Sequence, residues 1–410
     1  MDITVPAEVA DLAKRTQEFI RDVVMPVESE VAGVIHDAPD ELRRELQTKA
    51  RAAGLLAPHV PTEWGGCGLD IRGQAVVFEE AGYSLLGPLA LNCAAPDEGN
   101  MHLLEVVATE EQKERYLRPL AAGAARSCFA MTEPAPGAGS DPSMLSTTAV
   151  AAGGGWRIDG RKWFISGARG ADFAICMART SGAVGGRGGA TMFLVDADNP
   201  GMRVVRDLDT LDEGLFSGHS EVVFDDCRVG PDAVLGEVDR GFQYAQVRLA
   251  PARLTHCMRW LGLARHAHDI ALDWAATRKA FGGLLGDLGM VQGLIADSEI
   301  DLAASRALVW QTAAVLDRGD GGGTESSIAK TFVAEAVNRV VDRSVQLCGA
   351  LGISGDVLLS RYLREIRPFR IYDGSSEVHR WAIAKRSIGR RRRAIEAGER
   401  PRWDRAGEPS

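Results

Sequence analysis

Cysteines are few and scattered along this chain of 410 residues. No C-x-x-C pair occurs among its seven cysteines, which are Cys67, Cys93, Cys128, Cys176, Cys227, Cys257 and Cys348. This spacing predicts neither a zinc site nor a disulfide framework, and it favours a reducing cytoplasm. His102 has no second histidine or cysteine at metal-binding spacing, so we expect a packed or surface histidine and no metal site.

An excess of basic charge and long apolar runs are also missing. The formal net charge of -9 argues against nucleic-acid binding, because phosphate recognition needs a basic face. No stretch approaches the ~20 apolar residues that span a bilayer, and the N-terminus shows no basic leader followed by an apolar run. We interpret Arg390–Arg393 as part of a solvated tail. The chain is therefore expected to be soluble, without a membrane span.

The chain also lacks the G-x-G-x-x-G turn that binds dinucleotides. Its glycine-rich stretch, Gly182–Gly189, has neither that spacing nor a following helix, and it is more typical of a hairpin. A nucleotide cofactor is therefore expected at junctions between domains or subunits.

The remaining pattern divides the chain into three parts and a tail. A hydrophobic content of 45% over this length suffices for a large core and two or three domains. Apolar residues recur at helical spacing, give way to short runs broken by glycine, and then resume helical spacing. We predict an N-terminal all-α domain (1–125), a small β domain (126–236), a C-terminal helical bundle (237–395) and a tail (396–410). The bundle's broad apolar faces would suit packing against other subunits.

One stretch, Arg370–His379, places an acid beside a glycine turn. It reads RIYDGSSEVH, in which Ser375 or Ser376 could cap a helix with Glu377 in its first turn. Asp373 would then present a short carboxylate beside backbone N–H groups that can hold an anion. On its own, an Asp before a Gly is most often a plain turn residue.

A second stretch combines a loop with a strand. Met131–Asp141 (MTEPAPGAGSD) is too rich in proline and glycine for a regular element and predicts a loop that shapes a ligand site. Gly160–Asp172 (GRKWFISGARGAD) predicts a strand with Trp163 and Ile165 on one face and Phe164 and Ser166 on the other. Either segment alone would suggest an ordinary hairpin.

Together these stretches resemble the acyl-CoA dehydrogenase family. The family's motifs recur in order, as the TEP and GSD loop, GRKWFIS, RKAFG (Arg278–Gly282), QLCGALG (Gln346–Gly352) and YDGS (Tyr372–Ser375). The resemblance covers roughly Asp11–Ile388. It implies an α+β fold with an N-terminal α domain, a small central β-barrel or sandwich and a C-terminal four-helix bundle. It also implies noncovalent FAD between the β domain and the bundle, in a dimer or tetramer whose neighbouring subunit completes the site.

The family's flavin-ring contacts map onto the middle of the chain. The resemblance places Phe129, Met131 and Thr132 along the isoalloxazine, with the Thr132 hydroxyl bonding its pyrimidine side. Trp163 would pack against the ring, and Ser166 would lie toward N5.

The other implied contacts lie at distant motif positions. Arg278 and Phe281 would contact the pyrophosphate and adenine, and Gln346 and Gly349 would do so across the subunit interface. Further implied positions are Ser375 and Glu377 for the adenosine portion and Ser140, Arg253, Asp373 and Gly374 for the substrate.

The family chemistry is the oxidation of a CH–CH bond in an acyl-CoA. The thioester acidifies its α C–H, so a carboxylate can remove that proton while the β-hydrogen leaves as hydride, giving a trans-2-enoyl-CoA. Asp373 is the predicted base. The commonest family residue here is Glu, and the family's alternative base position is Ala252. We expect water exclusion by substrate to raise the proton affinity of Asp373.

An aspartate base leaves several activities open. The segments Thr255–Ala264 and Asp373–Arg380 are most similar to a subgroup with an Asp base, some of whose eukaryotic members are fused to a kinase-like domain. A dehydrogenase would pass electrons to an electron-transfer flavoprotein or another acceptor. Acyl-CoA oxidases and nitroalkane oxidases of the same superfamily use oxygen instead. A noncatalytic scaffold for acyl-CoA or flavin is the remaining alternative.

Overall fold

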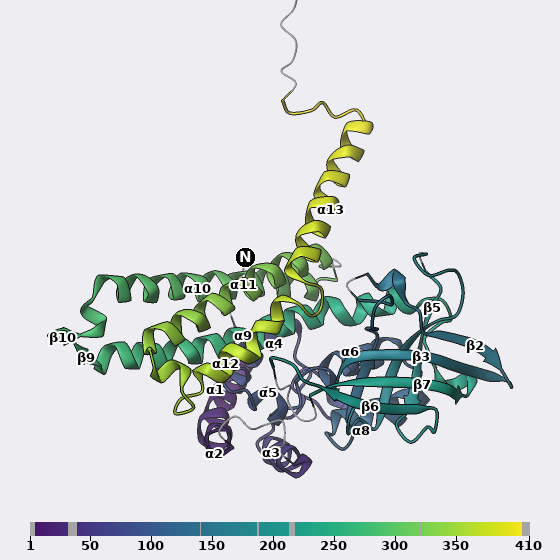
Figure 1. Ribbon diagram of the computed structural model, residues 1–410, viewed down its shortest axis with the longest axis horizontal. Coiled ribbons are helices and arrows are strands. Elements are labelled where there is room, and N and C mark those ends of the chain that lie inside the picture. The colour runs from purple at the N-terminus through teal and green to yellow at the C-terminus, as the bar shows by residue number, and fades with distance from the viewer. Residues whose placement is uncertain are drawn as a thin grey trace, which may run out of the picture.

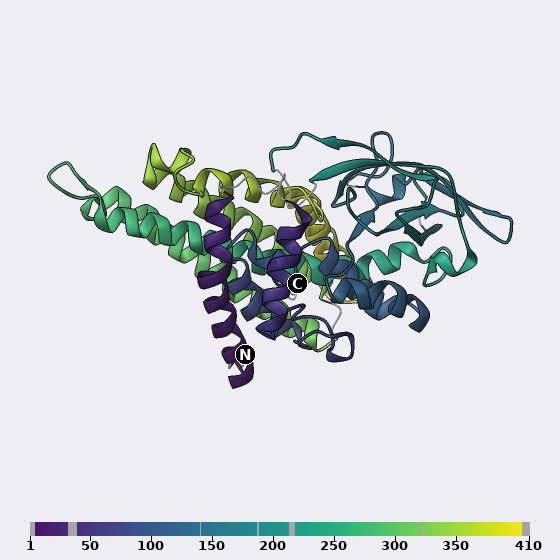
Figure 2. The same cartoon turned by 90° about the horizontal axis from the view of Figure 1, so that it is seen from below.

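The computed structural model describes residues 5–31, 39–139, 141–186, 188–212, 218–319 and 322–403. In chain order it forms a helical region, a sheet region and a second helical region, which confirms the predicted α+β architecture (Figure 1). The sheet lies at one end of the molecule, and the long helices of the second helical region extend away from it (Figure 2). Ser140 and residues 404–410 of the predicted tail lie outside the described residues.

The N-terminal region is built from short helices around a shared apolar core. These are α1 (Ala7–Phe19), α2 (Met25–Glu30), α3 (Asp40–Ala52), α4 (Ile71–Ala81), α5 (Gly87–Ala90), α6 (Asp97–Val107), α7 (Glu110–Gln112) and α8 (Arg118–Ala121). Before α7, the Thr109 hydroxyl accepts from the Gln112 N–H while the Gln112 side chain accepts from the Thr109 N–H. This reciprocal cap satisfies two N–H groups that a helix start leaves free.

The central region is an eight-stranded sheet. Its strands are β1 (Ser127–Ala130), β2 (Thr148–Ala152), β3 (Gly155–Ser166), β4 (Phe173–Arg179), β5 (Ala190–Asp196), β6 (Met202–Leu208), β7 (His219–Val229) and β8 (Val234–Leu235). The strand order is β6-β7-β3-β2-β4-β5-β8, with β1 parallel to β4. The glycine-rich segment after Arg179 connects the antiparallel β4 and β5, as a hairpin prediction requires.

Strand β4 separates two hydrophobic cores. Phe173, Ile175 and Met177 pack into the core shared with the helices, whereas Ala174 and Cys176 pack into a smaller core within the sheet region. Because side chains of a strand alternate between faces, one strand can close both cores at once. The sheet is thereby fixed against the helices, and its neighbouring strand β1 ends beside them.

The end of β3 departs from the predicted alternation. Phe164 has a φ of 52°, and the pairing of β3 with β7 shifts register between Lys162 and Ile165. Trp163, Phe164 and Ser166 consequently all line one cavity, while Ile165 is buried in the sheet core. The prediction that Trp163 shares a face with Ile165 is therefore wrong, because a bulge breaks the period of two.

In the described residues, four helices of the C-terminal region pack as a bundle, and Gly319 and Gly322 lie between α10 and α11. The bundle helices are α9 (Gly241–Thr277), α10 (Gly289–Asp317), α11 (Gly323–Cys348) and α12 (Leu359–Ile366). A hairpin of β9 (Lys279–Ala280) and β10 (Gly283–Leu284) joins α9 to α10 at the end remote from the sheet (Figure 1). Helix α13 (Ser376–Glu396) then projects away from the body of the molecule. No helix in the described ranges is long and apolar enough to cross a membrane.

Candidate active site

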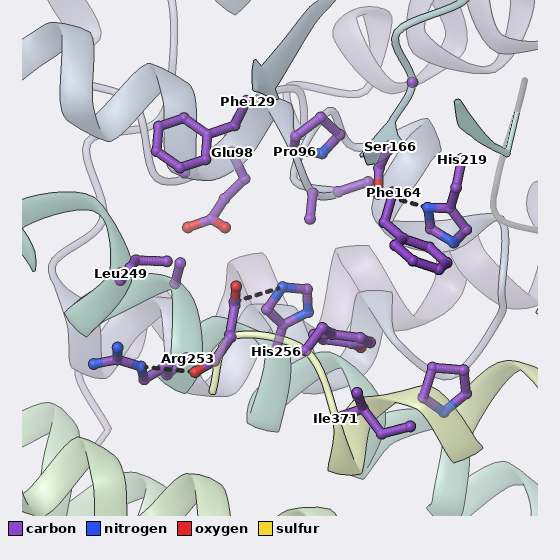
Figure 3. Close-up of a pocket in the computed structure, with 18 of the residues that line it drawn as sticks. Pro96, Glu98, Phe129, Phe164, Ser166, His219, Leu249, Arg253, His256 and Ile371 are labelled. Atoms are coloured by element: carbon purple, nitrogen blue, oxygen red, sulfur yellow. Dashed lines mark hydrogen bonds and ion pairs between the residues drawn. The ribbon is translucent and has the colours of Figure 1, made fainter. Parts of the chain in front are cut away.

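A cavity of about 1230 Å³ lies between the sheet, the bundle and the N-terminal helices. Pockets for one small ligand usually measure roughly 300–1,000 Å³, so this cavity has room for more than one such group. In Figure 3, Phe129, Phe164 and Ser166 face His256 and Arg253 across open space. The cavity therefore has a wall from the sheet region and an opposing wall from the bundle.

The sheet wall gathers the residues predicted to lie along a flavin ring. Phe129, Met131, Thr132, Trp163 and Ser166 all line the cavity. They are brought together because the end of β3 lies beside the segment after β1, where the Trp163 N–H donates to the Thr132 carbonyl at 3.0 Å. This wall offers aromatic faces next to two hydroxyl groups.

A buried ion pair holds this wall in place. The Glu133 carboxylate is 2.8 Å from Lys162 Nζ, and both side chains are fully buried. Glu133 also accepts from the hydroxyl of Ser146 and from backbone N–H groups of Ala138, Ser146 and Thr147. Burial alone would raise the pKa of Glu133, but the Lys162 ammonium and these hydrogen bonds lower it to about 2. The TEP and GRK motifs thus meet in a structural contact that shapes the loop.

Ser166 belongs to a chain of hydrogen bonds at the edge of the cavity. Its hydroxyl lies 2.8 Å from His219 Nδ1, and His219 Nε2 lies 3.0 Å from the carboxylate of Asp212. Burial alone would raise the pKa of Asp212, but the bond from His219 lowers it below its usual range. An ionised Asp212 accepts from an N–H on Nε2, and in the neutral tautomer that has this proton Nδ1 accepts from the Ser166 hydroxyl. This arrangement fixes where the Ser166 oxygen lies.

On the bundle wall, a tight turn between α12 and α13 carries Asp373. Asp373 has a φ of 54° and Gly374 a φ of 89°. A Cβ on Gly374 would come within 2.8 Å of the His379 ring, so the position requires glycine. Ser375 caps α13 by accepting from the Val378 N–H, as the sequence predicts.

Cationic and neutral donors fix the backbone of this turn. Arg253 Nε and His379 Nε2 lie 3.1 and 3.0 Å from the carbonyl oxygen of Asp373. Lys330 Nζ donates to the carbonyl of Gly374 at 2.7 Å. Burial lowers the pKa of His379 to about 4, so the ring is neutral near pH 7 and donates its N–H. Arg253 was predicted to be on the substrate side; it lines the cavity while holding the turn that presents Asp373.

The Asp373 carboxylate points into the cavity. Its Oδ2 lies 3.3 Å from His256 Nε2, and the two side chains are only 18% and 13% exposed. Burial alone would raise the pKa of Asp373. The hydrogen bond from His256 and the charges of Arg248 and Arg253 outweigh it and hold the pKa well below its usual range. The carboxylate is therefore ionised and directed at the space where a ligand would lie.

The remaining predicted cofactor contacts do not reach this cavity within one chain. Arg278 follows α9 and lies over the ring of Trp274, and Phe281 is 91% exposed in the β9–β10 hairpin. Gln346 and Gly349 lie at the end of α11, outside the cavity lining. Ser375 and Glu377 lie at the start of α13, where Ser375 is used as a cap. Contact between these residues and a cofactor in the cavity would need a second copy of the chain or a ligand that extends beyond it.

Sequence reasoning missed several cavity residues. They are Glu98 on α6, Arg248 and His256 on α9, and His219 and Asp212 beside β7. Arg248 is buried and stacks on the Phe129 ring at 4.2 Å. One available signal was the i,i+3 spacing of Arg253 and His256, which places both on one side of a helix.

Comparison with known proteins identifies the family to which this fold belongs. Profiles of the acyl-CoA dehydrogenase N-terminal, middle and C-terminal domains match residues 6–124, 128–227 and 239–388. The chain belongs to the acyl-CoA dehydrogenase family. Membership makes it a flavoprotein oxidoreductase with FAD as its cofactor.

Its relatives are varied. The Probable acyl-CoA dehydrogenase FadE2 of Mycobacterium tuberculosis is 35% identical over 97% of this chain and 99% of its own. Acyl-CoA dehydrogenase family member 10 of Mus musculus is 35% identical over 95% of this chain, which spans only 38% of that protein. A 3-(aryl)acrylate reductase of Clostridium sporogenes is 32% identical over 91% of this chain and 96% of its own.

Among solved structures, butyryl-CoA dehydrogenase of Megasphaera elsdenii matches with a TM-score of 0.85. It is 25% identical and covers 95% of this chain and all of its own. The likeness confirms the three-part fold.

The observed cavity suits FAD. It exceeds the volume of a usual single-ligand pocket, and its sheet wall combines the Trp163 and Phe164 rings with the Ser166 hydroxyl. Phe164, which is 48% exposed, would be covered by a ring that lies against this wall. Within the described ranges, no three His, Cys, Asp or Glu side chains are placed to hold a metal ion.

Proposed function

We propose that this protein oxidises an acyl-CoA thioester to a trans-2-enoyl-CoA, with Asp373 as the base. One observation carries the proposal: an ionised, inward-pointing carboxylate lies opposite the wall formed by Phe129, Trp163 and Ser166. Bound FAD supplies the acceptor for the β-hydride. The chain's own residues then have to hold the substrate, exclude water and remove the α-proton.

The geometry of the turn supports the role of Asp373 as the group that removes the α-proton. Arg253 and Lys330 hold the carbonyls of Asp373 and Gly374, so the carboxylate projects from a fixed backbone. The pKa of Asp373 is low in the free protein, which makes it a weak base there. A thioester carbonyl that enters the cavity displaces water and raises the proton affinity of the carboxylate, as burial does for carboxyl groups in general. Ser140 and Gly374 remain proposed substrate contacts.

An anaerobic titration tests the proposal and its rivals. Purified protein with FAD is mixed with acyl-CoA thioesters from short to very long, and the flavin absorbance is followed. Bleaching by at least one thioester is expected, with slow recovery in air. Rapid recovery in air would instead favour an acyl-CoA oxidase. Bleaching by a nitroalkane alone would favour a nitroalkane oxidase, and no bleaching by either class would favour a noncatalytic scaffold.

Completion of the FAD site by a second copy is a further part of the proposal. Arg278 and Gln346 lie far along the bundle from Asp373, and exposed apolar side chains such as Phe281 and Met290 lie near the same end. We expect a homodimer or homotetramer in which Arg278→Ala weakens FAD retention without altering the cavity of its own chain. Light scattering with a flavin-release assay checks this, and a monomer that retains FAD tightly would contradict it. An electron-transfer flavoprotein as acceptor and a cytoplasmic location stay predictions.

A further inference from the structure

His256 is the one side chain in the described residues that an ion-pair distance joins to the Asp373 carboxylate. Asp373 contacts it through Oδ2, and no side chain in the described ranges donates to Oδ1. An aspartate side chain is one methylene shorter than glutamate. The position of its carboxylate is therefore set by the backbone, and the direction of each oxygen is set by rotation of the carboxylate. A single fixed donor on Oδ2 would stop that rotation and leave Oδ1 toward the cavity.

The protonation state of His256 follows from its other neighbour. Arg259 Nη2 lies 3.2 Å from His256 Nδ1, and an arginine can only donate. Nδ1 must therefore be the unprotonated nitrogen, which puts the proton on Nε2, the nitrogen that faces Asp373. Burial lowers the pKa of His256, and the charge of Arg259 adds to this effect. The ring is thus a neutral donor.

Arg259 is itself anchored on the far side. Its Nη1 donates to the Cys93 carbonyl at 2.8 Å and lies 3.4 Å from Glu98 Oε2. Glu98 also accepts from the Thr255 hydroxyl at 3.0 Å. The rings of Tyr372 and Phe369 lie 5.0 and 5.9 Å from the imidazole. His256 is therefore fixed by hydrogen bonds and ring contacts before any ligand enters.

We propose that His256 is a positioning residue, which aims the Asp373 carboxylate by donating from Nε2 while Arg259 fixes its tautomer. This inference rests on the proposed function of Asp373 and deepens it. The donor also makes Asp373 a weaker base, so its benefit is orientation. Loss of the donor should lower the rate and move the pH dependence upward.

Charged and titratable side chains from several elements surround Asp373 and His256 and interact with them electrostatically. They are Arg248, Arg253 and Arg259 on α9, Glu98 on α6, Lys330 on α11, His379 on α13 and Tyr372 in the same turn. Asp212 before β7 acts on Tyr372. The substitutions below leave all of these unchanged, so a pH shift reports the lost donor.

Two substitutions separate orientation from packing. The side-chain amide of His256→Gln can donate from nearly the same place as Nε2, whereas His256→Leu cannot donate. In anaerobic stopped-flow reduction, we expect His256→Leu to lower the rate about 10- to 100-fold, because small misplacements of a reacting group cost that much. Its acyl-CoA dissociation constant should stay near that of the wild type, and the pH midpoint should rise. His256→Gln should recover much of the rate.

A matched control is His266→Leu. His266 is also buried on α9, bonds to the Tyr362 hydroxyl and lies outside the cavity lining. It should leave the rate and the pH midpoint unchanged. A wild-type rate in His256→Leu, or equal losses in the Leu and Gln variants without a pH shift, would overturn the proposal.

Nitrogen NMR tests the inference without turnover. In protein with ¹⁵N-labelled histidine, the signal that His256→Gln removes should report a neutral ring protonated at Nε2. Its Nε2 shift should change in Asp373→Asn, because the acceptor becomes a neutral amide. A ring protonated at Nδ1, an imidazolium, or a signal unaffected by Asp373→Asn would overturn it. If no thioester reduces the wild-type flavin, the proposed function fails, while these shifts still decide the role of His256.

Discussion

Glu133 and Asp373 are both carboxylates with pKa values below the usual range, but their surroundings differ. Glu133 is fully buried, pairs with Lys162 and accepts bonds from Ser146, Thr147 and Ala138. Asp373 is 18% exposed, bonds one neutral histidine and faces a cavity. A carboxylate whose oxygens are saturated by the protein has no capacity left for a substrate. A shifted pKa alone therefore does not indicate a base; unused hydrogen-bonding capacity at the cavity is what favours Asp373 over Glu133 as the proposed base.

The sharpest test of this comparison is Asp373→Asn. Asn keeps the size of the side chain and the backbone of the turn, but it cannot accept the α-proton. Removal of a positioned base typically lowers a rate by ~10²–10⁴. Anaerobic stopped-flow should show that loss in flavin reduction, with FAD content and acyl-CoA binding retained. Equal rates for the wild type and Asp373→Asn would place the base elsewhere.

Glu133→Gln should show the opposite pattern, in which the main loss is in stability. It leaves the Lys162 ammonium buried without its counter-charge, and breaking a buried pair in this way costs about 3–5 kcal/mol. Urea unfolding of the FAD-bound protein should report that loss. The loss for Asp373→Asn should be much smaller, because water in the cavity can solvate its neighbours.

The matched control for Glu133→Gln is the double variant Glu133→Gln with Lys162→Met. It removes the stranded charge. The single Gln oxygen accepts from the same loop N–H groups in both variants, so the double variant should be more stable than Glu133→Gln alone. A double variant that is less stable than the single one would show that the ion pair is not what holds the loop.

Asp373→Glu should have a smaller effect than Asp373→Asn. The longer side chain keeps a carboxylate but shifts it by ~1.5 Å, about one C–C bond. A misplacement of that size costs up to roughly 10²-fold in rate. Stopped-flow reduction should therefore place Asp373→Glu between the wild type and Asp373→Asn. A rate as low as that of Asn would mean that the turn tolerates no other carboxylate position.

Sequence patterns predicted the order of the helical and β regions and several of the residues that line the cavity, because those depend on apolar spacing and on motif letters. They missed the bulge at Phe164, since period-two alternation gives no sign that a bulky residue adopts a positive φ. They also missed His256. Its partner Asp373 is more than a hundred residues away in sequence, and only the packing of α9 against the later turn brings them together. Spacing along a chain reports helix faces and strand faces, but not which faces meet.

Acid should narrow the stability difference between the wild type and each carboxylate variant. Unfolded Glu and Asp have pKa values of roughly 4.3 and 3.9, while the pKa of folded Glu133 is about 2 and that of folded Asp373 is also lowered. A carboxyl group with a lowered folded pKa stabilises the fold fully above its unfolded pKa and loses that contribution as pH falls through the folded pKa. The deficit of Glu133→Gln should therefore be largest near neutral pH, shrink below about pH 4.5 and approach zero near pH 2. That of Asp373→Asn should shrink in the same direction from a smaller starting value. Urea titrations of the three proteins across this range measure both deficits, and a Glu133→Gln deficit that grows as pH falls would mean that ionised Glu133 does not stabilise the fold.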